Sequence, residues 1–205
     1  MGSKLRMIKS LVLGLNYAKG RNELDYIKLN KEISYALRHA PWEYQLELDN
    51  EGWVPVSQLI DALNQNIEWK DVTEQDIQNI INKFDKKRFE INENKIRALY
   101  GHSVPFKIEK TPIKPPDILY HGTTNEAYKR IIVNGLLPQS RQYVHLSLTM
   151  DVAKQVGLRR CKEPVILVVN AGKAYKEKIK FYKGNEFVWL ADKIPPKYIT
   201  LIDNL

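Results

Sequence analysis

The amino-acid sequence predicts an α+β protein with two lobes of different character. Three observations carry this prediction: helically spaced apolar residues with one hairpin in the first half, a proline-rich stretch in the middle, and short apolar runs in the second half. Four prolines and several lysines lie within Pro105–Pro116, a composition typical of an extended linker. We therefore place the boundary between the lobes near Glu109.

Two helices are expected early in the first lobe. Apolar residues recur at helical spacing through Leu29–Ala40, and Pro41 fits the end of that helix. After a turn, Val54–Leu63 opens a second helix, for which Ser57 is the expected N-cap.

A third helix and a hairpin complete the first lobe. Thr73 begins a stretch that resembles a capping box, with Asp76 in place of the usual Glu or Gln. The segments Arg88–Asn92 and Lys95–Tyr100 follow as two strands joined by a turn. Three helices and a β-hairpin in this order indicate a winged-helix unit.

The second lobe is expected to hold a compact, mostly buried sheet. Several of its apolar runs are too continuous to leave one face in water. Helices are expected over Asn125–Asn134, ending at Gly135, and over Met150–Arg160. The predicted strands are Ile118–Tyr120, Val144–Leu146, Val165–Val169 and Phe187–Leu190.

Composition narrows the class of partner. The net charge of +8 and a pI near 9.4 favour a polyanion, either nucleic acid or an anionic membrane. No segment is long and apolar enough to span a bilayer. Cys161 is the only cysteine, which excludes an internal disulfide and a cysteine-built zinc site and suits a reducing compartment such as the cytoplasm. The histidines lack metal-ligand spacing, so we expect no metal.

Basic residues in the first lobe have two interpretations. Arg38 and His39 close the first helix, where cations complement the helix dipole, but they also suit a phosphate site. The run Lys86-Lys87-Arg88 is typical of a solvated face, or of a phosphate cradle at the foot of the hairpin. Arg97 and His102 lie on the return side of that hairpin. From these residues alone, the structural interpretation is favoured in each case.

The segment His121-Gly122-Thr123-Thr124 follows a predicted strand and is more informative. A glycine there lets a ligand approach the backbone, whose N–H and C=O groups can pair with a planar amide such as that of nicotinamide. Thr123 or Thr124 can also serve as the N-cap of the next helix. A Rossmann fingerprint and a Walker-type phosphate loop are both absent from the sequence.

Taken in order, these motifs resemble those of the NAD-dependent RNA 2'-phosphotransferase family. The resemblance runs from about Leu29 to the C-terminus, which divides the chain into an N-terminal extension (1–28), a first lobe (29–109) and a second lobe (110–205). The matching stretches are Leu29-Asn30-Lys31 through Leu37-Arg38-His39, Leu48-Asp49 with Glu51-Gly52-Trp53-Val54, Asp85-Lys86-Lys87-Arg88-Phe89, Ile96-Arg97-Ala98 with Gly101-His102-Ser103, Leu119-Tyr120-His121-Gly122-Thr123, Gly135-Leu136 with Ser140-Arg141, Val144-His145-Leu146-Ser147 and Asn185-Glu186-Phe187-Val188-Trp189-Leu190.

The resemblance implies a winged-helix-like lobe and an ADP-ribosyltransferase-like lobe with the active site between them. It also implies that an internal RNA 2'-phosphate, as left by tRNA splicing, attacks the nicotinamide-bearing carbon of NAD and expels nicotinamide. The ribose 2''-hydroxyl of the RNA-phospho-ADP-ribose intermediate then attacks the phosphate, which frees the RNA and ADP-ribose 1'',2''-cyclic phosphate. In such chemistry the protein supplies cations that position phosphate rather than a nucleophile of its own.

The family's essential residues correspond to Arg38, His39, Arg88 and Arg141. On the NAD side the resemblance points to His121, Gly122 and Thr123, with His145, Leu146 and Ser147 on the facing strand. Further RNA or phosphate contacts are expected from Lys86, Lys87, Arg97 and His102, whereas Asn185–Trp189 receive no definite contact.

Two alternative functions are also compatible with parts of this sequence pattern. The protein can stop after the first step and leave ADP-ribose on a terminal phosphate of nucleic acid, or it can be a basic winged-helix module that binds RNA without catalysis. The intact set of arginines and histidine favours the full phosphotransferase. We expect a monomer that uses NAD as co-substrate, binds RNA and does not bind a membrane.

Overall fold

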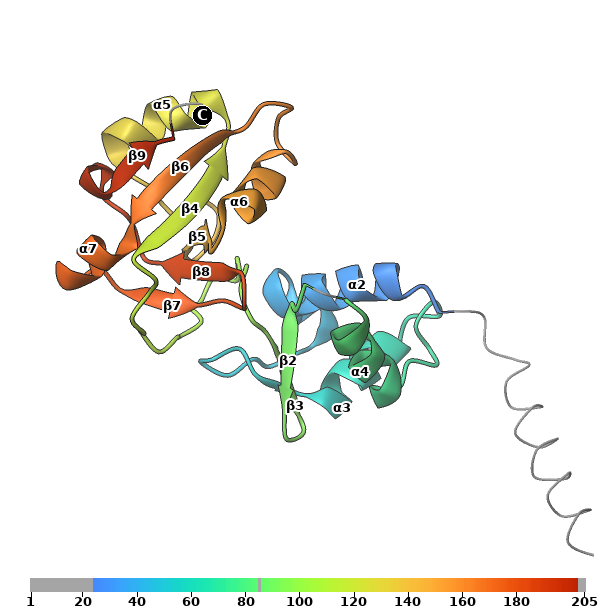
Figure 1. Ribbon diagram of the computed structural model, residues 1–205. Coiled ribbons are helices and arrows are strands. Elements are labelled where there is room, and N and C mark those ends of the chain that lie inside the picture. The colour runs from blue at the N-terminus through green and yellow to red at the C-terminus, as the bar shows by residue number, and fades with distance from the viewer. Residues whose placement is uncertain (1–23, 85, 203–205) are drawn as a thin grey trace, which may run out of the picture.

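The computed structural model describes residues 24–84 and 86–202. It confirms a mixed α+β fold with two antiparallel sheets, each packed with its own helices (Figure 1). The smaller sheet has the strand order β1-β3-β2, and the larger has the order β7-β8-β5-β4-β6-β9. Each sheet faces a separate hydrophobic core. Within the described ranges, no helix has the length and apolar character that crossing a bilayer requires.

The first helix, α2 (Tyr26–Arg38), begins three residues before its predicted start at Leu29. The reason is Asp25, whose carboxylate accepts hydrogen bonds from the backbone N–H groups of Ile27 and Lys28 at 2.9 and 3.1 Å. The helix ends at Arg38 rather than Ala40, and a 3-10 turn, η1 (Pro41–Tyr44), follows.

Strand pairing, rather than a side-chain cap, sets the start of the second helix. Val54–Pro55 form a short strand, β1, against β3, and α3 (Val56–Asn64) follows at once. The backbone N–H of Val56 bonds Asn94 O at 2.8 Å. Ser57 therefore lies inside the helix, and its prediction as the N-cap was wrong.

The third helix and the hairpin agree with their sequence signals. Helix α4 (Glu74–Lys83) has a capping box in which Asp76 accepts from the backbone N–H of Thr73 at 2.9 Å. Strands β2 (Phe89–Asn92) and β3 (Lys95–Ala98) pair antiparallel and are slightly shorter than predicted.

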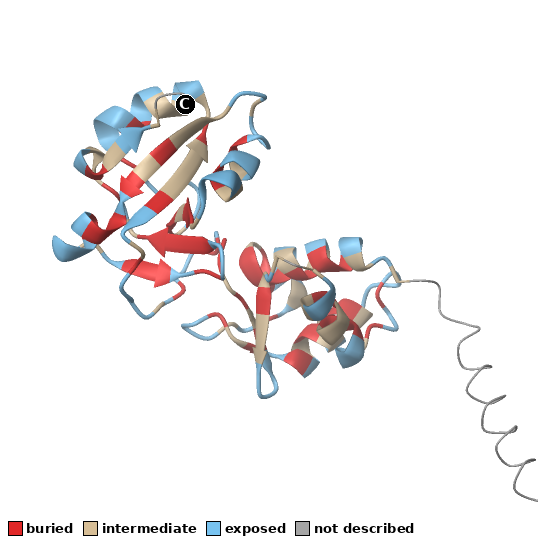
Figure 2. Cartoon of the chain, viewed as in Figure 1, coloured by how far each residue is buried: buried red, intermediate tan, exposed pale blue. Residues whose placement is uncertain are grey.

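All four predicted strands of the second lobe form, with shifted ends. They are β4 (Ile118–Thr123), β5 (Val144–Ser147), β6 (Val165–Asn170) and β8 (Val188–Ala191). Every residue of β8 is buried (Figure 2). His121 to Thr123 thus lie within β4 instead of following it. Two further strands were not predicted: β7 (Phe181–Lys183) and β9 (Ile199–Leu201), which form the edges of the sheet.

The helices of the second lobe flank this sheet (Figure 1). Helix α5 (Asn125–Asn134) ends at Gly135, as predicted, and this glycine adopts a φ of 81°. Helix α6 (Met150–Gly157) stops short of the predicted Arg160, because the chain tightens into a turn in which Arg160 N bonds Gly157 O at 2.8 Å. Helix α7 (Ala171–Lys176) and the 3-10 turn η2 (Pro196–Tyr198) were not predicted.

Candidate active site

Arg38 ends helix α2 with a charged side chain that is only 8% exposed. Its guanidinium carbon lies 5.2 Å from the ring centroid of Tyr100 and 5.7 Å from that of Phe89, and Nη2 donates to Arg88 O at 3.2 Å. Nε is buried and has no hydrogen-bond partner among the residues that the structure describes. Burial and the charges of neighbouring arginines lower the pKa of Arg38 to about 10, so the side chain is still cationic at neutral pH.

His39 lies directly after Arg38, at the end of the helix. Its Nδ1 is 2.8 Å from the hydroxyl of Ser103, and the backbone N–H of Ser103 donates to Arg38 O at 2.9 Å. Burial, followed by the charges of Arg141 and Arg38, lowers the pKa of His39. A neutral imidazole in this position can pass a proton in either direction at physiological pH.

Arg141 reaches the same place from the loop before β5. Its Nη1 donates to Gly101 O at 3.0 Å. Gly101 has a φ of 93°, and a Cβ atom there would lie 2.6 Å from Nη1 of Arg141 and 3.6 Å from Nη1 of Arg38. Glycine suits this backbone conformation, and any side chain at this position would displace the end of Arg141.

Arg88 joins the group from the foot of the hairpin, just before β2. Its carbonyl accepts from Arg38, and its charge is among the causes that lower the pKa of Arg38 and of Lys86. Lys86 is half-buried, and burial together with the charges of Arg159, Arg88 and Arg38 lowers its pKa to about 8. Among the described residues, no carboxylate forms an ion pair with Arg38, Lys86, Arg88 or Arg141.

Asn185 ties this basic segment to the second lobe. Its Nδ2 donates to Lys87 O at 2.8 Å and to the Tyr100 hydroxyl at 3.4 Å. Its Oδ1 accepts from the backbone N–H groups of Phe187 and Val188 at 2.9 and 2.8 Å. The side chain is 8% exposed, and all of these bonds orient it toward the backbone beside Arg88. No contact was predicted for Asn185, because two of its partners, Lys87 and Tyr100, lie far away along the chain.

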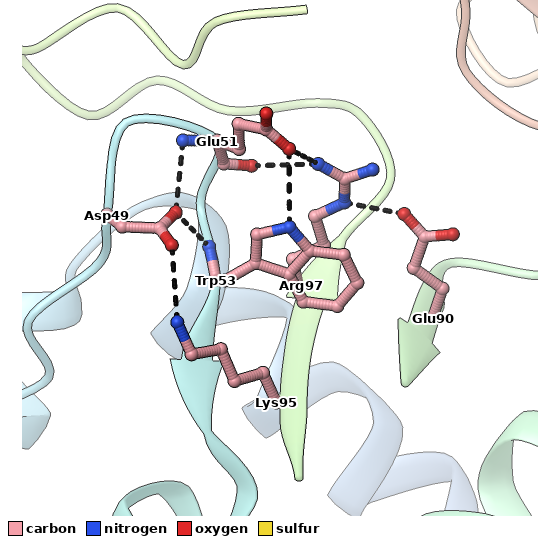
Figure 3. A network of polar contacts seen from close by, with 6 residues as sticks. All are labelled: Asp49, Glu51, Trp53, Glu90, Lys95 and Arg97. Atoms are coloured by element: carbon pink, nitrogen blue, oxygen red, sulfur yellow. Dashed lines mark hydrogen bonds and ion pairs between the residues drawn. The ribbon is translucent and has the colours of Figure 1, made fainter. Parts of the chain in front are cut away.

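Two residues expected to contact phosphate have other surroundings. Arg97 donates to Glu90 at 2.5 Å and to the carboxylate of Glu51 at 2.8 Å, with its guanidinium 4.3 Å from the ring centroid of Trp53 (Figure 3). His102 is 2% exposed, and burial lowers its pKa to about 3, so its imidazole is neutral. The structure does not bring Arg97 into the group of unpaired cations.

The residues expected on the NAD side lie on two neighbouring strands. Nδ1 of His121 donates to His145 O at 2.9 Å, and Nδ1 of His145 donates to Tyr143 O at 3.0 Å, because a carbonyl can only accept. Burial lowers the pKa of both histidines, that of His145 to about 4. Each neutral ring therefore has Nε2 as an acceptor, and Nε2 of His145 is buried without a partner.

Gly122 and Thr123 have structural roles beside any role in binding. A Cβ on Gly122 would lie 1.9 Å from Ala153 O in helix α6, so only glycine lets that helix pack directly on β4. Thr123 is 8% exposed and pairs with Val165. The N-cap of helix α5 is Thr124, whose hydroxyl accepts from Ala127 N at 3.2 Å.

Leu146 and Ser147 continue β5 beyond His145. Leu146 is buried in the core of the second lobe, and Ser147 is 6% exposed and pairs with Tyr120. The ring of Tyr100 stands edge-on to that of His145 at 6.0 Å between centroids. Since the guanidinium of Arg38 also lies against the ring of Tyr100, this tyrosine connects the cationic group with the histidine strands.

The geometry defines a cationic group, Arg38, Arg88 and Arg141 with His39 and Lys86, beside a pair of neutral histidines. Sequence reasoning missed Tyr100, Gly101 and Asn185 as its supports, and Arg159 and Arg160, whose charges act on Lys86 and Arg141. Within the described ranges, no group of three or more potential ligands could hold a metal ion. Such an arrangement suits a substrate with a doubly charged phosphate and a second, polar reactant.

Comparison with known proteins gives a consistent result. The profile described as "RNA 2'-phosphotransferase, Tpt1 / KptA family" matches residues 25–193. The chain is 58% identical to the probable RNA 2'-phosphotransferase of Acetivibrio thermocellus, over 86% of this chain and 97% of that protein. It is 57% identical to that of Bacillus thuringiensis subsp. konkukian, over 87% and 97%, and 39% identical to that of Pyrococcus furiosus, over 85% and 94%.

Proposed function

Because this chain belongs to the RNA 2'-phosphotransferase, Tpt1 / KptA family, we propose that it removes an internal 2'-phosphate from RNA by transferring it to NAD. The observation that carries the proposal is the cationic group. Arg38 and Arg141, which are far apart in the chain, meet at Gly101, and the charge of Arg88 acts on Arg38. Among the described residues, no carboxylate forms an ion pair with any of the three. Holding like charges together is costly unless an anion binds between them.

The proposed chemistry has two displacements. A 2'-phosphate oxygen bonds to the ribose carbon of NAD as the bond from that carbon to nicotinamide breaks. The ribose 2''-hydroxyl then bonds to phosphorus as the bond from phosphorus to the RNA 2'-oxygen breaks, and the hydroxyl proton ends on that oxygen. The products are nicotinamide, RNA with a 2'-hydroxyl and ADP-ribose 1'',2''-cyclic phosphate. Both nucleophiles belong to substrates, which accords with a site rich in cations.

The residues of the cationic group have different proposed roles. Arg38 and Arg88 bind the phosphate oxygens, and the buried, unpartnered Nε of Arg38 is a donor held ready for one of them. Arg141 stabilises the charge on phosphorus during the second displacement. His39, kept neutral by its surroundings, takes the proton of the attacking hydroxyl and returns it to the leaving oxygen. Lys86 and Lys87 add contacts to the RNA backbone.

The histidine strands offer a fitting site for the nicotinamide riboside of NAD. His145 presents a buried acceptor, Nε2, which has no hydrogen-bond partner within residues 24–84 and 86–202. His121, Gly122, Thr123, Leu146 and Ser147 would surround it, since β4 and β5 are neighbours in the sheet. NAD supplies the electrophilic ribose carbon, while these residues orient it toward the phosphate.

The remaining parts of the proposal concern the whole chain. We propose that residues 29–109 form a winged-helix-like lobe and residues 110–205 an ADP-ribosyltransferase-like lobe. The protein would act as a cytoplasmic monomer on spliced tRNA or a similar RNA. Support comes from the cationic group, to which both lobes of one chain contribute, and from the single cysteine, which suits a reducing compartment.

Nicotinamide release tests this proposal. The protein is incubated with NAD and an RNA oligonucleotide that has one internal 2'-phosphate, and nicotinamide is quantified by chromatography. We expect release in proportion to the 2'-phosphate supplied, and none with the same oligonucleotide bearing a 2'-hydroxyl. Equal release without the 2'-phosphate would contradict the proposal. A stable ADP-ribose cap on a 5'-phosphorylated oligonucleotide would instead favour an enzyme that stops after the first displacement.

A further inference from the structure

Residues 101–108, here named the bridging segment, run between the two lobes and are held from both sides. The sequence predicts an extended linker over Pro105–Pro116, yet Ile108 is completely buried. Three consecutive residues of the second lobe contact this segment: Arg141, Gln142 and Tyr143. A segment held so closely is part of the architecture of the site rather than a spacer.

Gln142 makes most of these contacts. Its Nε2 donates to Val104 O at 3.0 Å and to Phe106 O at 2.6 Å, and its Oε1 accepts from Ile108 N at 2.9 Å. Its own backbone N–H donates to His102 O at 3.3 Å. One primary amide therefore forms hydrogen bonds with the backbone of three alternate residues, which requires two donor hydrogens and one acceptor oxygen on the same side chain.

The neighbours of Gln142 extend the contact in both directions. Arg141 donates to Gly101 O at 3.0 Å at one end of the bridging segment. The hydroxyl of Tyr143 donates to Ile108 O at 2.7 Å at the other end. The amide of Gln142 thus fixes the middle of a stretch whose first residue is bonded to a proposed catalytic guanidinium.

The first lobe holds the same segment from the opposite side. The N–H of Ser103 bonds Arg38 O, and its hydroxyl bonds Nδ1 of His39. The bridging segment consequently sets the separation between two parts of the cationic group: Arg38 and His39 on helix α2, and Arg141 on the second lobe. A shift of this segment would move one part relative to the other.

We propose that Gln142 is a positioning residue, which holds the bridging segment so that Arg141 faces the phosphate bound by Arg38 and Arg88. This inference rests on the proposed function and deepens it. Gln142 need not touch either substrate, because it acts through the backbone of residues 101–108. Its loss should therefore affect the displacement that depends on Arg141 more than the binding of NAD.

The test separates the two chemical steps in single turnovers. Gln142→Ala is mixed with NAD and the 2'-phosphorylated oligonucleotide, and nicotinamide and phosphate-free RNA are followed together. We expect the second step to slow roughly 10- to 100-fold, since misplacement by about 1 Å has effects of that order. Nicotinamide release should change much less, so that RNA-phospho-ADP-ribose accumulates. Gln142→Glu should show the same defect, because a carboxylate cannot donate to Val104 O and Phe106 O.

Two further variants show whether the defect is specific to the bridging segment. Tyr143→Phe keeps its buried ring but loses the bond to Ile108 O, and we expect a smaller defect in the same step. Gln58→Ala removes an amide that donates to Gln45 O at 3.1 Å, far along the chain from the bridging segment, and should behave as wild type. Thermal melting confirms that each variant is folded before it is assayed.

The outcomes are distinct. A folded Gln142→Ala protein with wild-type rates, or with both steps slowed equally, would overturn the positioning role. Failure of the wild-type protein to release nicotinamide would instead refute the proposed function, without reference to any variant.

Discussion

At the scale of single residues, the site is defined by cationic side chains that form no ion pair with a carboxylate in the part of the chain that the structure describes. Arg38 is buried between two aromatic rings, and Arg141 lies across Gly101 from it. Arg97 shows the contrast, because two carboxylates and Trp53 occupy its guanidinium. All three arginines lie within sequence motifs, so the sequence alone does not show which of them are neutralised. The positions of Glu51 and Glu90 in the folded protein show that Arg97 is.

Arg141→Ala tests the role assigned to that unpaired charge. We expect overall turnover to fall by about 100-fold, the typical effect of removing one donor that stabilises charge in a transition state. RNA carrying ADP-ribose should accumulate, because Arg38 and Arg88 still support the first displacement. Gel analysis of end-labelled RNA measures both quantities. Arg130→Ala, on exposed helix α5, is the control, and unchanged turnover in Arg141→Ala would contradict the assignment.

The charge of Lys86 is expected to make the activity fall at alkaline pH. Its pKa is lowered to about 8, so the free protein loses this charge as the pH rises through that value. We expect kcat/KM for RNA to decline above pH 8 in the wild type, and Lys86→Arg to remove this decline because arginine stays charged. Lys129→Arg, on helix α5, should keep the wild-type profile. Identical profiles for Lys86→Arg and wild type would show that the charge of Lys86 plays no part.

At the scale of elements, strong local signals gave accurate predictions and weak ones failed. The capping box at Thr73 and the glycine that ends α5 identify their helices correctly. The edge strands β7 and β9 are three residues each, which is too short for a periodic pattern to reveal them. Ser57 has the chemistry of an N-cap, but after the pairing of β1 with β3 the N-cap position falls on Pro55, two residues earlier.

The packing of helix α6 against strand β4 can be tested directly with a single substitution. Gly122→Ala would place a Cβ 1.9 Å from Ala153 O, and helix α6 would have to move. We expect a loss of about 3 kcal/mol in the free energy of unfolding, measured with urea. Gly52→Ala is a graded control, since its Cβ would meet nothing closer than 3.4 Å and only its φ of 84° is unfavourable, at a cost of about 1 kcal/mol. Equal stability of Gly122→Ala and wild type would show that the helix can shift freely.

At the scale of the whole molecule, the two lobes are joined by polar contacts that no local pattern indicates. Asn185 donates a hydrogen bond to the carbonyl of Lys87, 98 residues away. The side chain of Gln142 forms hydrogen bonds with the bridging segment, 34 to 38 residues upstream. The predicted linker has the composition of an extended spacer, and its packing depends on these distant partners. The sequence therefore predicts which residues carry charge, whereas their convergence depends on tertiary contacts.

The net charge of +8 favours a polyanionic partner, and the structure concentrates unpaired cations where both lobes meet. The most direct measurement of the central claim follows the phosphate itself, with radioactive phosphorus placed only in the 2'-phosphate of an RNA oligonucleotide. Incubation with NAD should move the label into ADP-ribose 1'',2''-cyclic phosphate and leave an intact RNA with a 2'-hydroxyl. Label that stays on the RNA, or leaves it as inorganic phosphate, would contradict the account.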